Sequence, residues 1–135
     1  TEASINRIPD SDFLAGWREA ARVAELGMKA AGATKALCQI AGYARSREGK
    51  HSIGFVFSEA ERAYADSVAH LRRGLSAPAS RIRDVSRDDL YRGLAIAYQA
   101  LGDEEQLAET KAAWEAAAPY SAARFFDASG GPAIG

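Results

Sequence analysis

Residues 90–106 read LYRGLAIAYQALGDEEQ, and this stretch is the clearest indication of how the chain folds. Tyr91, Leu94 and Tyr98 recur at intervals of three and four residues, which places them on one face of an α-helix. Ala95 lies among them and leaves a gap into which a neighbouring helix can pack a side chain. The following Leu-Gly-Asp ends the helix, because glycine accepts the left-handed conformation and aspartate caps the helix that returns. The stretch therefore predicts a tight helical hairpin.

The composition favours an all-α protein. The 135 residues are 47% hydrophobic and 26% charged, as in chains that fold around one core in water. Alanine, the best helix former, is the most frequent residue, and no stretch alternates apolar and polar residues as a strand would. No apolar run approaches the ~18 residues that cross a bilayer. The net charge of −1 gives no overall attraction to nucleic acid or to an acidic membrane.

Capping residues, glycines and apolar periodicity divide the chain into five main helices and a short C-terminal one. We expect an irregular lead over residues 1–9, a single helical domain over 10–126 and a flexible tail over 127–135. The main helices are expected at residues 12–31, 35–47, 58–74, 86–101 and 104–118, and one or two more turns at 120–126. Short loops imply antiparallel neighbours, so the two candidate folds are an array of helical hairpins and a closed up-down bundle.

Each expected main helix carries an apolar stripe for the core. Outside the opening stretch, the stripes are Phe13, Trp17, Ala21, Ala24 and Met28; Leu37, Ile40, Ala41 and Ala44; Ala60, Tyr64, Val68 and Leu71; and Leu107, Thr110, Trp114 and Ala117. Gly49 is expected to end the second helix, and Ser58 with Glu61 forms a capping box for the third. The apolar segment between them either fills the core or extends the third helix backward.

The hairpin resembles the tetratricopeptide repeat. That family places a large residue, a leucine, a small residue and a tyrosine on its first helix, turns at Gly-Asp and ends in proline. The matching residues, at the family's spacing over ~34 residues, are Tyr91, Leu94, Ala95, Tyr98, Gly102, Asp103 and Pro119. The returning helix departs from the pattern, because Leu107 and Trp114 are bulky where the family prefers alanine. These residues suggest a divergent repeat or an end cap. A weaker second match combines residues 37–44 with Ala60, Tyr64 and Ser67.

The resemblance implies a scaffold or adaptor whose concave groove holds a peptide or helix from another protein. We expect this groove on the inner faces of the second and fourth helices. The expected partner-binding residues are Arg45, Arg83, Arg87, Tyr91, Phe125 and Phe126. The arginines would attract an acidic segment. The aromatic residues either pack in the core or, in the case of Phe125 and Phe126, anchor the C-terminal tail on this chain or on a neighbour.

No catalytic or metal-ligating pattern emerges. His51 and His70 have no second histidine three or four residues away, and Asp66 can pair with His70 on one helix face. Cys38 is the one cysteine, so it forms no disulfide within the chain; it is expected as a buried hydrophobe and is compatible with a reducing compartment such as the cytoplasm. Asp88 stands in a helix first turn, where it offsets the helix dipole. The sequence predicts no catalytic residue, no cofactor and no metal.

Two other classes of function stay open. A closed bundle could bind a small ligand or carry out chemistry through inward polar side chains, for which the candidates are Cys38, Gln39, Tyr64 and Gln99. A nucleic-acid binder could use residues 72–92, which contain six arginines and three aspartates. No aromatic stacking platform lies among these arginines, which disfavours nucleic acid.

Overall fold

A computed structural model describes residues 10–52, 57–78 and 86–128. The helices are α2 (Asp10–Ala31), α3 (Lys35–Ser52), α4 (Phe57–Ser76), α5 (Arg87–Leu101), α6 (Glu104–Ala117) and α7 (Pro119–Ala128). The predicted all-α fold of five to six helices is confirmed. The expected lead and residues 129–135 of the expected tail lie outside the described part, whereas residues 127 and 128 belong to α7. None of the described helices is long and apolar enough to span a membrane.

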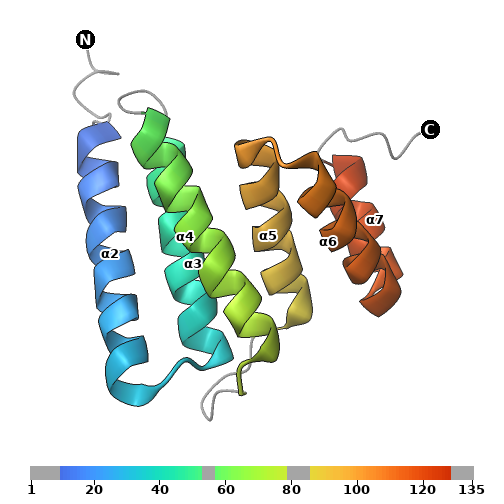
Figure 1. Ribbon diagram of the computed structural model, residues 1–135, viewed down its shortest axis with the longest axis horizontal. Helices are drawn as coiled ribbons and strands as arrows, with labels where there is room; N and C mark the ends of the chain where they lie inside the picture. The colour runs from blue at the N-terminus through green and yellow to red at the C-terminus, as the bar shows by residue number, and fades with distance from the viewer. Residues whose placement is uncertain (1–9, 53–56, 79–85, 129–135) are drawn as a thin grey trace, which may run out of the picture.

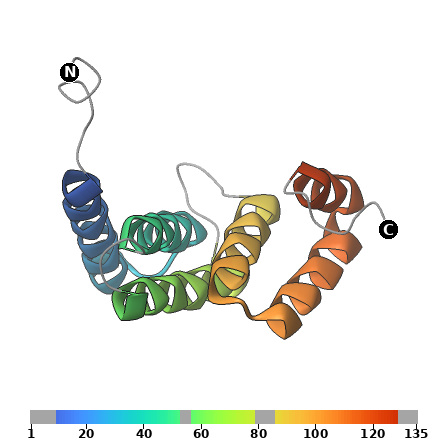
Figure 2. The same cartoon turned by 90° about the horizontal axis from the view of Figure 1, so that it is seen from above.

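The helices stack in chain order, with α2 and α7 at opposite ends (Figure 1). Each helix packs against the next, and α5 also contacts both α3 and α7. Figure 2 shows α3 and α5 on the same side of α4. Within the described residues α2 packs only against α3, so the ends of the array do not meet. Of the two predicted folds, the chain adopts the open array of hairpins.

The predicted hairpin of α5 and α6 is confirmed. Ser86 caps α5 by accepting a hydrogen bond from the Asp89 backbone N–H. Gly102 ends the helix in the left-handed conformation, with a φ of 70°. Asp103 caps α6 by accepting from the Gln106 backbone N–H at 3.1 Å. Each of these residues acts on backbone groups within a few residues of itself, so the sequence alone could predict its role.

α3 differs most from its prediction. It continues to Ser52, and Gly49 lies inside it, because the ring of Tyr64 from α4 occupies the space a side chain would need. A Cβ built on Gly49 would lie 2.7 Å from that ring. Ile40, expected in the core, is 49% exposed. The buried positions of α3 are mostly small, since the helix packs closely against both α2 and α4; they are Cys38, Ala41, Gly42, Ala44, Glu48, Gly49 and Ser52.

Other helix ends and faces also differ from expectation. Phe13 is 39% exposed and stacks on His51, and Leu14 takes the expected core place beside Ala21. Ala117 is exposed. α4 begins at Phe57, so Ser58 lies within its first turn and the expected capping box is wrong. Residues 53–56, whose role was left open, lie outside the described part.

Leu71 of α4 joins the N-terminal half of the array, α2 to α4, to the C-terminal half, α5 to α7. Its side chain is 1% exposed and packs with Leu90, Leu94 and Tyr98. Gly42 of α3 and Gly93 of α5 lie against it, and a Cβ on either glycine would come within 2.7 Å of Leu71 atoms. The two glycines therefore let α3 and α5 approach the same leucine.

Trp114 of α6 is the centre of the C-terminal half. Its side chain is fully buried against Ala95, Ala122 and Phe126. The indole N–H donates to Oδ1 of Asp88 at 2.7 Å, and the Ser121 hydroxyl donates to Oδ2 of the same carboxylate at 3.0 Å. Asp88 thus connects the first turn of α5 to both α6 and α7, in addition to its predicted place at the helix dipole.

Candidate interaction groove

A groove with a volume of about 360 Å³ opens between α3 and α5, above α4. Leu71 and Tyr64 of α4 form its floor, together with Gly42 and Gly93. The wall on α3 consists of Gln39, Tyr43, Ser46, Arg47 and Lys50, and the wall on α5 of Asp89, Arg92 and Ile96. The wall positions recur every three or four residues, so each wall is one face of its helix. The groove lies between the second and fourth of the main helices expected from the sequence.

Large apolar side chains are exposed along this groove. Tyr43 and Ile96 line it from opposite walls and are 48% and 41% exposed. Ile40 precedes Tyr43 by three residues and is exposed as well. The other exposed large hydrophobic side chains among those whose burial is described lie on the end helices α2 and α7. Exposed apolar side chains on both sides of a hollow are typical of a binding site.

The two walls of the groove differ in charge. Arg92 on α5 lies 3.3 Å from the Asp89 carboxylate, so these two charges offset each other. Within the part of the chain that the structure describes, neither Arg47 nor Lys50 on α3 pairs with a carboxylate. Uncompensated positive charge therefore lies on the α3 wall alone.

Arg47 is held in place by aromatic rings. Its guanidinium carbon lies 5.6 Å from the ring centroid of Trp17 on α2 and 5.8 Å from that of Tyr43. The two rings meet edge to face at 5.5 Å. Such cation–π contacts contribute about 0.5–1 kcal/mol each. The Nε atom of Arg47 is buried and has no hydrogen-bond partner among the residues that the structure describes.

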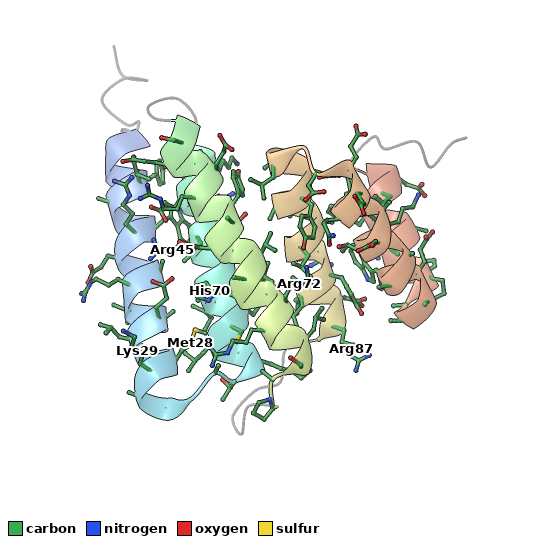
Figure 3. The ribbon with its side chains drawn as sticks, viewed as in Figure 1. Met28, Lys29, Arg45, His70, Arg72 and Arg87 are labelled. Atoms are coloured by element: carbon green, nitrogen blue, oxygen red, sulfur yellow. The ribbon has the colours of Figure 1, made fainter. Side chains whose placement is uncertain are left out.

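Arg45, which we expected to bind a partner, is instead engaged where α2 and α3 meet (Figure 3). Its guanidinium bonds to Glu25 of α2 and, at 2.7 Å, to Glu48 of its own helix, and these carboxylates raise its pKa. His70 of α4 lies 2.7 Å from Oε2 of Glu25, the oxygen that also accepts from Arg45 Nε, rather than pairing with Asp66 as predicted. Arg45 is therefore occupied in holding helices together.

Arg18 extends this network to α4. Its Nε donates to Glu48 at 2.9 Å and its Nη2 to Glu59 at 3.0 Å. These side chains join α2 to α4, although the two helices do not pack directly against each other. The network therefore fixes the end helix α2 to the rest of the array.

The network predicts that stability depends on pH through Glu25. Hydrogen bonding from Arg45, supported by His70, lowers the pKa of Glu25 despite its burial. A carboxylate whose pKa is lower in the folded than in the unfolded state stabilises the fold at pH values above its unfolded-state pKa. This stabilisation is lost as the pH falls through the folded-state pKa. The variant Glu25→Gln is expected to have a free energy of unfolding about 1–3 kcal/mol lower than the wild type at neutral pH, because it loses charge-assisted hydrogen bonds.

Urea denaturation of the wild type and of Glu25→Gln between pH 7 and pH 3 measures this effect. The difference in the free energy of unfolding between the two proteins should be largest above about pH 5 and should shrink below the usual carboxylate pKa of 4.5. Glu109→Gln, which removes an exposed carboxylate outside the network, is the matched control and should leave the profile unchanged. A constant difference across this pH range would contradict the assignment.

The other predicted arginines do not gather at the groove. Arg83 lies outside the described residues. Arg87 is exposed in the first turn of α5, far from Arg45 (Figure 3). Arg72 lies close to α5, where it donates to the Tyr98 hydroxyl at 3.4 Å. The arginine-rich segment therefore forms no single patch among the described residues.

The predicted aromatic anchors belong to the C-terminal cluster. Tyr91 stacks on Trp114 with ring centroids 6.2 Å apart. Phe125 and Phe126 pack on the same indole at 5.4 and 6.0 Å, and Phe126 is only 4% exposed. None of the three lines the groove. Their position is explained by core packing.

The polar residues considered for a closed bundle are dispersed in the open array. Cys38 is fully buried, as expected of a small hydrophobe, and burial raises the pKa of its thiol. Gln39 and Tyr64 line the groove, whereas Gln99 is exposed. No cluster of three or more His, Cys, Asp or Glu that could hold a metal ion occurs within residues 10–52, 57–78 and 86–128.

Sequence reasoning missed the residues that form the groove walls. These are Tyr43, Arg47 and Lys50 on α3 and Arg92 and Ile96 on α5. A usable signal was present, because residues 39, 43, 46, 47 and 50 share one helical face that combines apolar and basic side chains. This face was not recognised because the helix was expected to end at residue 47, before Lys50.

Comparison of the chain with protein-family models, with curated proteins and with solved structures gives no match.

Proposed function

We propose that this chain is a non-catalytic interaction module, an adaptor or an assembly subunit, that binds a segment of another protein in the groove between α3 and α5. One observation carries the proposal: an open hollow with a buried apolar floor has exposed Tyr43 and Ile96 on its two walls. Exposing such side chains to water is unfavourable, and a partner that covers them recovers the free energy of burial. Aromatic and branched side chains at the centre of an interface supply much of its binding energy.

The arrangement of the helices supports the same proposal. The two helices that line the groove, α3 and α5, lie side by side across α4, and each begins a hairpin. This arrangement is what the tetratricopeptide-like spacing of Tyr91, Leu94, Ala95 and Tyr98 led us to expect, and the repeat identity is part of the proposal. Open arrays of hairpins present extended surfaces suited to peptides.

A small ligand is the second candidate function. The hollow of about 360 Å³ lies in the range of small-molecule sites, which is roughly 300–1,000 Å³. The polar groups of the groove are spread along both walls, from Gln39 to Lys50 on α3 and from Asp89 to Arg92 on α5, which favours a longer occupant over a compact one.

The proposal predicts that Ile96→Asp weakens peptide binding and that Leu26→Asp does not. Both side chains are exposed, at 41% and 51%, so neither substitution should disturb the core, and Leu26 lies on α2 outside the groove. Peptides selected from a random library on the wild-type chain should bind Ile96→Asp at least tenfold more weakly, a loss of about 1.4 kcal/mol or more. Fluorescence anisotropy of the labelled peptides measures the dissociation constants.

Three outcomes separate the alternatives. Loss of binding in Ile96→Asp alone supports the groove. Equal loss in both variants, or loss only in Leu26→Asp, would place binding elsewhere and refute it. Failure to select any peptide, together with saturable binding of a small compound that Ile96→Asp removes, would replace the peptide with a small ligand.

A further inference from the structure

We infer that the occupant of the groove is a short extended protein segment, that one of its acidic side chains lies on the α3 wall, and that an apolar side chain lies between Tyr43 and Ile96. This inference rests on the proposed function and adds the chemistry and the orientation of the partner segment.

The orientation follows from the uneven charge of the walls. Arg47 and Lys50 lie about one helical turn apart on the α3 wall. Neither has a carboxylate partner among the described residues. On the opposite wall Arg92 is already paired with Asp89. A carboxylate of the partner therefore gains most beside α3. The rings of Trp17 and Tyr43 fix the Arg47 guanidinium there, so little side-chain freedom is lost when the carboxylate binds.

The shape of the groove favours an extended segment over a helix. The α3 wall runs from Gln39 to Lys50, a length of about 16 Å at the rise of an α-helix. About five residues of extended chain cover that length. Because α3 and α5 contact each other, a helix ~10 Å wide cannot enter between them down to the floor. An extended chain is narrower and can insert alternate side chains.

The apolar contact follows from the floor. Leu71 and Tyr64 close the bottom of the groove, and Tyr43 and Ile96 stand on either side of it. In an extended segment, side chains alternate between two directions. One apolar side chain can then point to Leu71 while a neighbouring acidic one reaches toward Arg47 and Lys50.

The test is a pair of parallel selections from one random library of peptides of about 12 residues, longer than the ~five that an extended chain needs. One uses the wild-type chain and the other the double variant Arg47→Glu and Lys50→Glu. Wild-type selection should enrich Asp and Glu beside an apolar residue, and the charge-reversed chain should enrich Lys and Arg. Replacing the acidic residue of a selected peptide by its amide should weaken binding about tenfold, because a charge-assisted hydrogen bond is lost.

The control double variant is Lys29→Glu and Arg73→Glu. Both side chains are exposed and lie outside the groove, and the change in net charge is the same. It should select the same acidic peptides as the wild type. If Arg47→Glu fails to fold, Lys50→Glu alone changes only an exposed side chain and should still weaken the acidic peptides and their dependence on salt.

Each result has a distinct meaning. Peptides that depend on Ile96 but show no acidic preference, or whose preference survives the reversal on α3, would overturn this inference and leave the proposed function standing. Selected peptides that lose binding when trimmed from about 11 residues, the helical length of the wall, to about five would show that the occupant is a helix. Peptides insensitive to Ile96→Asp would overturn the proposed function itself.

Discussion

Replacing Trp114 by alanine is expected to lower the free energy of unfolding by about 3–5 kcal/mol, the range observed when a large buried aromatic is truncated. The indole is fully buried between α5 and α7, against Ala95, Ala122 and Phe126. Its removal leaves a cavity that Ala95 and Ala122 are too small to fill. It also leaves the Asp88 carboxylate without the indole N–H, with only the Ser121 hydroxyl as a remaining donor.

The effect should be concentrated in the C-terminal half. Among the described helices, α6 and α7 pack against the rest of the array only through α5, so loosening them leaves the packing of α2, α3 and α4 in place. Hydrogen exchange should therefore show earlier loss of protection in α6 and α7 than in α3. Fluorescence of Trp17, the remaining tryptophan, reports the state of the N-terminal half in the same sample.

Two further variants separate the causes of the Trp114 effect. Trp114→Phe keeps an aromatic ring but removes the donor to Asp88, and it should cost less than alanine but more than a surface change. Tyr120→Ala removes an aromatic side chain that is 76% exposed in α7, and it should change stability by no more than about 0.5 kcal/mol. A Trp114→Ala protein as stable as Tyr120→Ala would contradict the central position of the indole.

The hairpin of α5 and α6 could be predicted because its signals are local. Ser86, Gly102 and Asp103 act on backbone groups within a few residues of themselves, and periodicity alone places Leu94 and Tyr98 on the buried face. The structure bears out these positions. The same reasoning did not find the tie from Asp88 to Trp114, because it joins residues 26 positions apart.

The end of α3 could not be predicted, because a glycine in a helical sequence can either end the helix or allow another side chain to pack closely against it. Gly49 is a plausible end to a helix, but here it makes room for a ring supplied by Tyr64. That ring belongs to another helix, so no local pattern distinguishes the two cases. Ile40 was misplaced for a related reason. A helix packed on two sides buries its small residues, and the large residue then faces the open side.

The candidate site shows the same limit. The resemblance led us to expect a groove between the second and fourth main helices, and its role in binding is a proposal. Arg45, a basic residue expected to bind there, faces α2 instead. Arg45 and Arg47 are two positions apart, which turns them roughly 200° from each other on a helix. Arg45 faces Glu25 of α2, and Arg47 faces the groove. Which of the two is available to a partner depends on where α2 packs, and that is a property of the fold.

Substitutions at Leu71 and at Gly42, which packs against it, are also expected to lower the free energy of unfolding substantially. Leu71→Ala should lower the free energy of unfolding by about 2–5 kcal/mol, because a fully buried leucine leaves a cavity. Gly42→Ala should also destabilise the fold. Its new methyl group would lie 2.6 Å from Cγ and Cδ2 of Leu71 and 3.3 Å from the backbone oxygen of Ser67. Overpacking costs about 1–3 kcal/mol, which exceeds the gain of about 1 kcal/mol from replacing glycine in a helix.

The control for the glycine substitution is Gly16→Ala in α2. No atom lies within 4 Å of the position its Cβ would take, so only the helix propensity changes. This variant should be more stable than the wild type by about 0.5–1 kcal/mol. Opposite signs for Gly16→Ala and Gly42→Ala would isolate the contact with Leu71 from the general preference for alanine.

The double variant Gly42→Ala with Leu71→Ala tests the contact directly. Once Leu71 is truncated, the atoms that the new methyl group would strike are gone, and the substitution at Gly42 should become neutral or stabilising. Urea denaturation of the four proteins gives the coupling energy, which we expect at about 1–3 kcal/mol, as for residues in direct contact. Additive effects would show that α3 can shift away from Leu71 without cost. Because Leu71 is also the floor of the groove, such a shift would mean that α3 is not fixed relative to α5, and the walls on which the binding proposal rests would not be held at their present separation.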